Sequence, residues 1–337
     1  MKISAAILGC SGPRLHPDER RFFAQANPWG FILFARNVEN PDQLARLTAD
    51  LRDAVGRDAP ILIDQEGGRV ARMRAPHWQE WLPPLDLVTK LDPDAQTRAI
   101  STRYRVIAAE LRDVGIDVNC APTLDIATPQ THPFLRNRCL GENAAQVARN
   151  GRAAATALLA GGVLPIIKHA PGHGRAVQDS HQTLATSPAT LEQLQNEEFA
   201  PFAALADLPL AMTGHILFPA MDPDNCATFS PKILCHLRIG LGFNGLLISD
   251  DLSMEALDGD LAQRTTRALA AGCDVALHCN GKLDEMLMVV ASAGPLTDIA
   301  AQRAARALAM RRKPEKCDLR AILAEAQSYE SEVPHAR

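Results

Sequence analysis

The chain has few aromatic residues, no apolar run of membrane-spanning length and no strong excess of either charge. Phe, Trp and Tyr make up 4% of its 337 residues, which argues against a long cleft lined with stacking rings. The net charge of −4 gives no indication of a nucleic-acid or anionic-membrane partner. No apolar stretch is long enough to cross a bilayer. These absences favour a globular protein with a compact binding site.

The eight cysteines form no C-x-x-C pair and are scattered through apolar segments. This distribution argues against a zinc site or a disulfide framework and is typical of free thiols in a reducing compartment. We therefore expect a cytoplasmic protein. Near the N-terminus, the apolar stretch at residues 3–8 is shorter than the h-region of a signal peptide, and we interpret it as part of a first buried strand.

Short apolar runs alternate along the chain with segments of helical periodicity. The expected strands lie at residues 5–9, 30–35, 60–63, 116–120, 163–167, 209–212, 245–248 and 274–277. Residues 41–56 begin with proline and end with glycine, as helices commonly do, and residues 142–162 and 190–207 have the same periodicity. Eight strands that alternate with helices predict an α/β fold, a single-domain (β/α)8 TIM-type barrel.

A doubly wound sheet is the rival architecture. Such a sheet usually binds a nucleotide at a glycine-rich first turn, but the first turn here, residues 9–13, has no G-x-G-x-x-G pattern. We expect the catalytic barrel to cover residues 1–310. Residues 311–337 are charged, and we expect a helical extension and a tail there rather than a second domain.

The carboxyl ends of the strands share one face of such a barrel, and active sites lie on that face. Polar residues stand at or just beyond the ends of six predicted strands: Asp64, Asp125, Lys168 with His169, His215, Asp250 with Asp251, and His278. Together these positions predict a polar funnel.

Two acidic residues and one histidine are the candidates for the chemistry. Asp250 follows a run that looks buried, so it is the candidate nucleophile or charge stabiliser. The alternative is an N-cap for the next helix, although Asp251 suits that role better. His181 lies two residues after Asp179, whose carboxylate can accept one imidazole N–H and fix the tautomer. With an ordinary pKa of about 6.5, His181 is the candidate proton donor and acceptor; a solvated loop histidine is the alternative.

Five charged or titratable residues near the same rim offer both hydrogen-bond donors and acceptors, as sugar hydroxyls require. They are Asp64, Arg72, Arg138, Lys168 and His169. For the two arginines, the alternative is a surface salt bridge. The low aromatic content favours a small pocket for a terminal sugar over a long polymer-binding cleft.

A barrel metallohydrolase would use several of the same residues. Suitable ligand types are present at His169, His173, His181, His215 and Asp250. However, the first strand has no H-x-H pair, and Lys168 beside the site disfavours a second cation. We therefore expect neither a metal nor a cofactor.

Five segments, in order along most of the chain, resemble glycoside hydrolase family 3, and within it the single-domain bacterial β-N-acetylhexosaminidases. They are ILIDQEGGRVARM (61–73), APTLDI (121–126), NRCLG (137–141), KHAPGHGRAVQDSH (168–181) and GFNGLLISDDLSM (242–254). The KH-x-PGHG…DSH and SDDLSM elements together are highly specific.

The resemblance implies a retaining exo-hydrolase that removes terminal β-1,4-linked GlcNAc from GlcNAc-anhydro-muramoyl peptides during peptidoglycan recycling. Asp250 would be the nucleophile of a covalent glycosyl-enzyme, and His181 the acid/base, oriented by Asp179. The residues that match the family's binding groups for the terminal sugar are Asp64, Arg72, Arg138, Lys168 and His169. We expect a monomer whose partner is a small glycan or muropeptide. Phosphate in place of water as the acceptor, a β-GlcNAc phosphorylase activity, remains an alternative.

Three residues depart from the family's pattern. Ala170 stands where KHFPGHG commonly has Phe, and Asn137 and Cys139 flank Arg138 where Asp and Ser are usual. We expect these departures to affect packing around the arginine rather than the reaction class.

Overall fold

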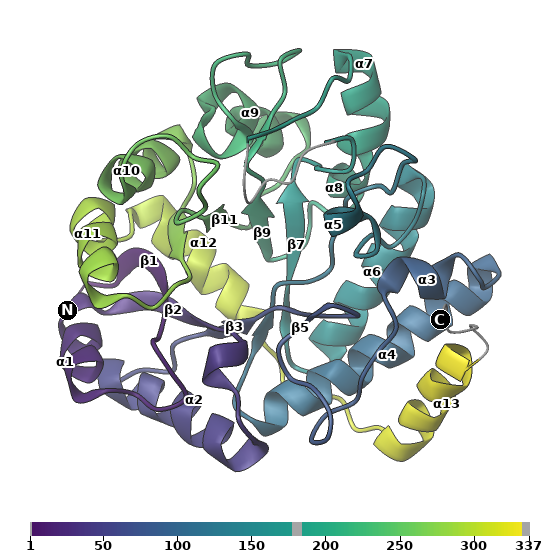
Figure 1. The fold of residues 1–337 in the computed structure, drawn as a ribbon, viewed down its shortest axis with the longest axis horizontal. Coiled ribbons are helices and arrows are strands. Elements are labelled where there is room, and N and C mark those ends of the chain that lie inside the picture. The colour runs from purple at the N-terminus through teal and green to yellow at the C-terminus, as the bar shows by residue number, and fades with distance from the viewer. Residues whose placement is uncertain (1, 177–183, 332–337) are drawn as a thin grey trace.

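The computed structural model describes residues 2–176 and 184–331. Eight parallel strands close into a barrel that is surrounded by helices (Figure 1). In order around the barrel the strands are β1 (Ser4–Gly9), β2 (Pro28–Leu33), β3 (Ile61–Ile63), β6 (Val118–Asn119), β7 (Leu164–Ala170), β9 (Leu210–Thr213), β11 (Leu246–Asp251) and β12 (Val275–His278). Each predicted run overlaps one of them, and the (β/α)8 prediction is confirmed.

Both faces of the barrel strands are buried, which explains their nearly continuous apolar sequences. One apolar cluster has members from all eight strands, among them Leu62 of β3, and it fills the barrel. The neighbours of Leu62, Ile61 and Ile63, belong to a second cluster that lies between the barrel and the helices. Alternate residues of a strand thus supply the two layers of the core.

The longer helices form the outer layer. They are α1 (Pro17–Ala26), α2 (Pro41–Val55), α4 (Pro93–Asp113), α6 (Ala144–Ala160), α10 (Leu261–Ala271), α11 (Leu283–Ala293), α12 (Asp298–Ala309) and α13 (Leu319–Ser331). The predicted limits of α2 hold because Asn40 accepts a hydrogen bond from the Gln43 amide at one end, and Gly56 adopts a φ of +65° at the other.

Shorter elements lie mainly in the loops around the barrel. The strands are β4 (Gln65–Gly67), β5 (Val70–Ala71), β8 (Ala185–Thr186) and β10 (Ile216–Leu217). The helices are α3 (Pro84–Val88), α5 (Pro133–Arg136), α7 (Leu191–Gln193), α8 (Ala200–Ala204) and α9 (Pro231–Cys235), the 3-10 turns η1 (Ala35–Asn37) and η3 (Ala227–Phe229), and the π-helical turns η2 (Leu194–Glu198) and η4 (His236–Gly240).

The single α-helix expected at residues 190–207 is instead α7, η2 and α8 in succession. The cap is as expected, because Thr190 and Gln193 form a reciprocal capping box. The helix then widens, and the Phe199 amide donates to the Leu194 carbonyl at 2.8 Å, five residues back. Pro201 has no amide hydrogen and cannot continue the regular ladder. The predicted start of this helix is therefore correct, but the prediction of one continuous α-helix is wrong.

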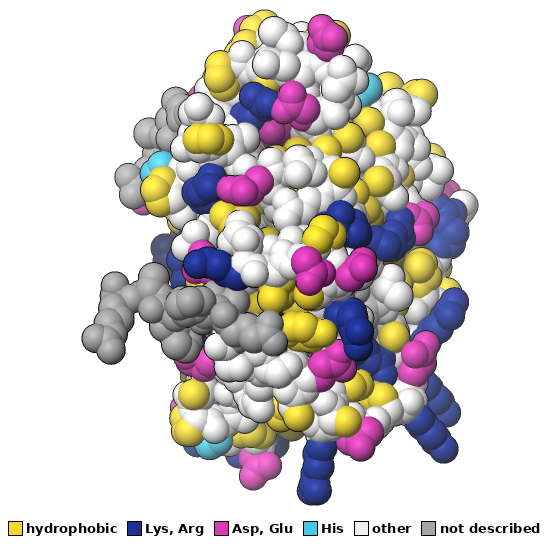
Figure 2. Space-filling model, turned by 90° about the vertical axis from the view of Figure 1, so that its right-hand side faces the viewer, with side chains coloured by type: hydrophobic (Ala, Val, Ile, Leu, Met, Phe, Trp, Pro, Cys, Tyr) yellow, Lys and Arg dark blue, Asp and Glu magenta, His cyan; other side chains and the backbone are white. Residues whose placement is uncertain are grey.

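Helix α13 lies beside α4 (Figure 1). Glu330 of α13 pairs with Arg103 of α4 and accepts a hydrogen bond from the Leu82 amide at 2.8 Å. On the face shown in Figure 2, cationic and anionic side chains are interspersed, in keeping with the small net charge. Within the described ranges, no helix is both long enough and apolar enough to span a membrane.

Candidate active site

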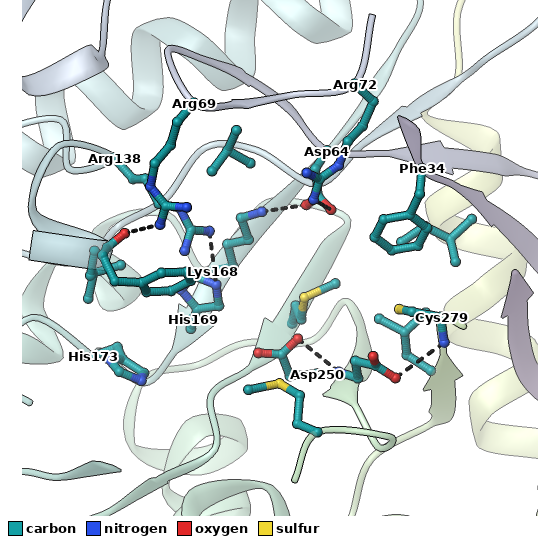
Figure 3. A pocket seen from close by; sticks show the side chains of 18 residues that line it. Phe34, Asp64, Arg69, Arg72, Arg138, Lys168, His169, His173, Asp250 and Cys279 are labelled. Carbon is teal, nitrogen blue, oxygen red and sulfur yellow. Dashed lines mark hydrogen bonds and ion pairs between the residues drawn. The ribbon is translucent and has the colours of Figure 1, made fainter. Parts of the chain in front are cut away.

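A cavity of about 250 Å³ opens at the carboxyl ends of the barrel strands (Figure 3). Its volume is somewhat below the roughly 300–1,000 Å³ of pockets for drug-sized ligands, so it suits one small ring. Its charged lining includes Asp64, Arg72, Arg138, Lys168 and Asp250, and its apolar lining includes Ile32, Phe34, Met212, Met254, Leu277 and Cys279.

Six of the eight residues predicted for the site line this one cavity. They are the five expected sugar-binding residues, Asp64, Arg72, Arg138, Lys168 and His169, and the expected nucleophile, Asp250. Asp179 and His181 lie outside the described residues, so their roles remain predictions.

Lys168 is buried on β7 between two carboxylates. Its Nζ lies 2.7 Å from Asp64 Oδ1 and 2.6 Å from Glu66 Oε1, and Arg72 reaches Asp64 Oδ2 at 3.1 Å. Burial would raise the pKa of Asp64, but the charges of Lys168 and Arg72 hold it well below its ordinary value. Burial likewise opposes the charge on Lys168, and the two carboxylates reverse this and raise its pKa. Asp64 and Lys168 are therefore both ionised at neutral pH.

Glu66 is a residue of this cluster that the sequence reasoning missed. It accepts a bidentate pair from Arg138, with Nε at 2.9 Å and Nη2 at 2.8 Å. It lies on β4, which pairs with β5 in a hairpin where Gly67 adopts a φ of +102°. Its position two residues after Asp64, in the segment QEGG, was the available signal. We call Asp64, Glu66, Arg72, Arg138 and Lys168 the ion network.

Arg138 is a buried member of the network rather than a surface arginine. Asn137 and Cys139, which flank Arg138 and depart from the family's pattern, do not pair with its guanidinium. Asn137 is exposed, and the Cys139 thiol is directed to the Leu135 carbonyl at 3.6 Å. The guanidinium is held by Glu66 instead, so these departures leave the arginine anchored.

His169 is oriented by Asp125, which follows β6. His169 Nδ1 lies 2.7 Å from Asp125 Oδ2, so the carboxylate holds the proton on Nδ1 and leaves Nε2 as an acceptor. Arg138 Nη2 lies 3.4 Å from that Nε2. Burial would raise the pKa of Asp125, but His169 lowers it below its ordinary value. Asp125 is thus a buried anion that fixes the ring of a cavity residue.

Asp250 is near the end of β11, and its side chain faces the cavity (Figure 3). Its Oδ1 accepts a hydrogen bond from the Asp251 amide at 2.8 Å, and no described residue donates to Oδ2. Burial would raise the pKa of Asp250, but the nearby His215 and His169 rings and the Asp251 amide lower it below its ordinary value. The carboxylate is therefore ionised at neutral pH, with one oxygen available to a ligand.

The expectation that Asp251 caps the next helix is wrong. Helix α10 is capped by Asp260, and residues 252–260 separate it from β11. Asp251 instead accepts hydrogen bonds from the Ser253 amide at 3.1 Å, the Ser253 hydroxyl at 2.7 Å and the Cys279 amide at 3.2 Å. Its carboxylate joins the ends of β11 and β12 and supports the loop that follows Asp250.

Fewer polar residues line the cavity than the sequence predicted for the funnel. His215 does not line the cavity, because its Nδ1 meets the Thr228 hydroxyl at 2.8 Å and its Nε2 meets the Asp251 carbonyl at 2.9 Å. His278 is fully buried, and Asp125 lies behind His169. Among residues 2–176 and 184–331, no group of three or more His, Cys, Asp and Glu side chains is placed to hold a metal ion.

Glu198 of η2 is buried beneath the turn at residues 172–174. Its Oε2 accepts a hydrogen bond from the Gly174 amide at 3.2 Å. Burial, and to a lesser extent the Asp125 charge, raise the pKa of Glu198 from its ordinary 4.5 to about 8. The folded protein therefore keeps a proton here that the unfolded chain releases.

This raised pKa predicts that the free energy of unfolding falls as the pH rises from about 5 to about 8. The folded state binds more protons than the unfolded state in that window, so one such group contributes a slope of up to about 1.4 kcal/mol per pH unit. Glu198→Gln should lack this dependence on pH, because the amide does not titrate. Its free energy of unfolding should therefore exceed that of the wild type at pH 8. Urea unfolding at each pH measures it.

The exposed neighbour provides the control for this prediction. Glu197→Gln removes a surface carboxylate that pairs with Arg175, and its stability should follow the wild type across the same pH range. Glu110, whose pKa is also raised by burial, to about 7, is present in all three proteins and cancels. Parallel pH profiles for the wild type and Glu198→Gln would contradict the assignment.

Comparison of the sequence with known proteins gives a consistent family. Residues 7–309 match the family described as "Glycosyl hydrolase family 3 N terminal domain". A β-hexosaminidase from Methylococcus capsulatus is 38% identical over 274 residues, which cover 80% of this chain and 80% of the relative. A β-hexosaminidase from Pseudomonas aeruginosa is 35% identical over 289 residues, 85% of each chain.

Solved structures give the same result. NagZ from Neisseria gonorrhoeae in complex with N-trifluoroacetyl-D-glucosamine aligns with a TM-score of 0.86 and 27% identity over 99% of both chains. A family 3 β-N-acetylglucosaminidase from Paenibacillus sp. aligns with a TM-score of 0.82 and 28% identity over 99% of this chain and 62% of the other.

Proposed function

The chain belongs to glycosyl hydrolase family 3 and is a glycosidase, and from this premise we propose that it is a retaining exo-β-N-acetylglucosaminidase. The observation that carries the proposal is that the carboxylate of Asp250 faces the same small cavity as Asp64, Arg72 and Lys168 of the ion network. The lowered pKa of Asp250 agrees with a role as an anion. The activities named for its relatives, β-hexosaminidase and β-N-acetylglucosaminidase, support the choice of sugar.

The ion network and His169 bind the hydroxyl groups of the terminal sugar. Asp64 accepts hydrogen bonds, Lys168 and Arg72 donate them, and the Nε2 atom of His169 accepts. These groups already hold one another in place, so little side-chain entropy is lost when the sugar binds. Because the cavity has room for about one ring, it favours removal of a terminal residue over cleavage within a polymer.

The reaction proceeds in two steps with Asp250 as the nucleophile. In the first, Asp250 Oδ2 attacks the anomeric carbon, a new C–O ester bond forms and the glycosidic C–O bond breaks as His181 donates a proton to the leaving oxygen. In the second, His181 removes a proton from water, which attacks the same carbon and releases the carboxylate. Asp179 orients the His181 ring. An imidazole therefore does the work that a second carboxylate does in most retaining glycosidases.

The natural substrates in this proposal are small peptidoglycan fragments, GlcNAc-anhydro-muramoyl peptides, in the cytoplasm. The segment KHAPGHGRAVQDSH supports the substrate through its resemblance to the bacterial single-domain enzymes. All eight cysteines are free thiols, six of them buried, which supports a reducing compartment.

Replacing His181 with alanine tests the proton-transfer role. We expect kcat/KM to fall by roughly 10²- to 10⁴-fold for an aryl β-N-acetylglucosaminide with a basic leaving group, such as phenol. With 2,4-dinitrophenol, which leaves without a proton, the first step should be much less affected. Steady-state rates on both substrates measure the difference.

A matched control is His77→Ala, because His77 is exposed and lies outside the cavity. Its rates should equal those of the wild type on both substrates. An equal loss on the two substrates in His181→Ala would show that His181 does not protonate the leaving group.

A further inference from the structure

We propose that His173 is an additional substrate-binding residue, whose ring hydrogen-bonds the substituent on carbon 2 of the bound sugar. The inference rests on the proposed function and specifies how the site distinguishes a 2-acetamido sugar. Its basis is a buried imidazole that lines the cavity but takes no part in the contacts described above.

The His173 ring is buried but unsatisfied. The residue is 6% exposed and lines the cavity, and neither ring nitrogen has a hydrogen-bond partner among the residues that the structure describes. By contrast, both nitrogens of His215 are bonded, and His169 is held by Asp125. Buried polar groups in native proteins are nearly always paired, so a ring left open toward a cavity points to a ligand as its partner.

The backbone on both sides of His173 is held tightly, which fixes the direction of the ring. Its amide donates to Asp125 Oδ1 at 2.9 Å. Gly172 adopts a φ of +140°, and a Cβ there would lie 2.9 Å from the Glu198 carbonyl oxygen. A Cβ on Gly174 would collide with the Ile126 backbone. Both neighbours of His173 occupy positions that only glycine fits. The turn therefore fixes the direction of the His173 side chain even when no ligand is bound.

Burial keeps the His173 ring neutral. Burial, reinforced by His169, lowers the pKa of His173 to about 4, although Asp125 and Asp250 oppose this. At neutral pH one ring nitrogen therefore donates a hydrogen bond and the other accepts one. A neutral imidazole is a poor proton donor to a leaving group, but it suits an amide or a hydroxyl.

The position of the ring indicates which substituent it meets. In Figure 3, His173 lies on the side of the cavity away from Asp64 and Arg72 and on the same side as Asp250. The ring of His169 lies between His173 and Asp64, and its centroid is 5.9 Å from that of His173. With the distal hydroxyls at the ion network and the anomeric carbon at Asp250, His173 faces the part of the sugar near the reacting centre. Of the two ring atoms bonded to the anomeric carbon, the ring oxygen carries no substituent, whereas carbon 2 does. In a 2-acetamido sugar this carbon carries an N–H and a C=O, both of which a neutral imidazole can bind.

Two variants and two substrates test this assignment. His173→Phe keeps the ring volume and removes both polar atoms, whereas His173→Asn keeps one donor and one acceptor. We expect His173→Phe to lower kcat/KM for 4-nitrophenyl β-N-acetylglucosaminide by about 10- to 100-fold. It should change kcat/KM for the 2-deoxy-β-glucoside by less than about threefold, and His173→Asn should recover part of the loss. Should the 2-deoxy substrate turn over too slowly, the inhibition constants of GlcNAc and 2-deoxyglucose provide the same comparison.

The possible outcomes separate this inference from the proposed function. Equal losses on the two substrates, or no loss on either, would overturn the role of His173 while the wild type still hydrolyses the N-acetylglucosaminide. A wild type that does not hydrolyse that substrate would instead refute the proposed function. Thermal melting of each variant identifies loss of folding, and if His173→Phe does not fold, the same comparison of substrates with His173→Asn decides.

Discussion

Replacing Asp250 with asparagine is expected to lower kcat/KM on an aryl β-N-acetylglucosaminide by roughly four orders of magnitude. An amide neither attacks the anomeric carbon nor carries the negative charge that stabilises the oxocarbenium-like transition state. The substitution preserves the volume of the side chain, and its Oδ1 can still accept from the Asp251 amide. The fold should therefore survive, and the loss should be in turnover, which initial rates measure.

The neighbouring carboxylate is the control for this result. In Asp251→Asn, the amide oxygen can still accept from the Ser253 and Cys279 amides, and its NH2 can donate to the Ser253 hydroxyl. We expect a loss much smaller than that of Asp250→Asn. If Asp250→Asn retains wild-type rates, or if Asp251→Asn proves the more damaging change, the nucleophile has been assigned to the wrong residue.

Replacing Lys168 with methionine should damage both stability and sugar binding. Methionine fills most of the space, but it leaves Asp64 and Glu66 buried with one fewer cation. Removal of one partner from a buried charge pair typically costs about 3–5 kcal/mol. We expect a loss of that size in the free energy of unfolding and a large rise in KM. Urea denaturation and steady-state kinetics measure the two effects.

An exposed lysine in a comparable ion pair is the control. Lys282 Nζ lies 2.9 Å from Glu285 Oε1 at the surface, where such pairs contribute little. Lys282→Met should therefore leave stability and KM unchanged. Equal free energies of unfolding for the two variants would show that the buried ion pairs of Lys168 contribute no more to stability than the exposed pair of Lys282.

The barrel was predictable because its strands are buried on both faces. Each strand then reads as a short apolar run, and the helix that follows begins and ends with recognisable residues, such as Asn40 and Gly56 at α2. The segment at residues 190–207 was harder, because apolar periodicity does not distinguish an α-helix from one with a π-helical turn. Only the position of Pro201 could have signalled the irregularity.

The residues on the strands were found more readily than those that support them. Asp250 and Lys168 interrupt apolar strands, and barrel topology directs the ends of those strands to one face. Glu66 lies on β4, in a polar segment just beyond β3. Its place close to Asp64 puts it near the site, but the sequence does not show that its carboxylate is buried. Arg138 was predicted as a site residue, but the sequence left a surface salt bridge open for it, because its burial depends on Glu66, which lies 72 residues away. Ion pairs between distant segments exist only in the folded chain.

In the proposed reaction Asp250 forms a covalent bond with the sugar, and trapping this glycosyl-enzyme would identify the nucleophile. The wild type would be incubated with a fluorinated N-acetylglucosaminyl substrate that slows the second step, and then digested and analysed by mass spectrometry. We expect a peptide that contains Asp250 and carries the mass of one fluorosugar, with no such adduct in Asp250→Asn. Normal turnover without any adduct would favour attack by the substrate's own acetamido oxygen, and an adduct on another residue would contradict the nucleophile assigned here.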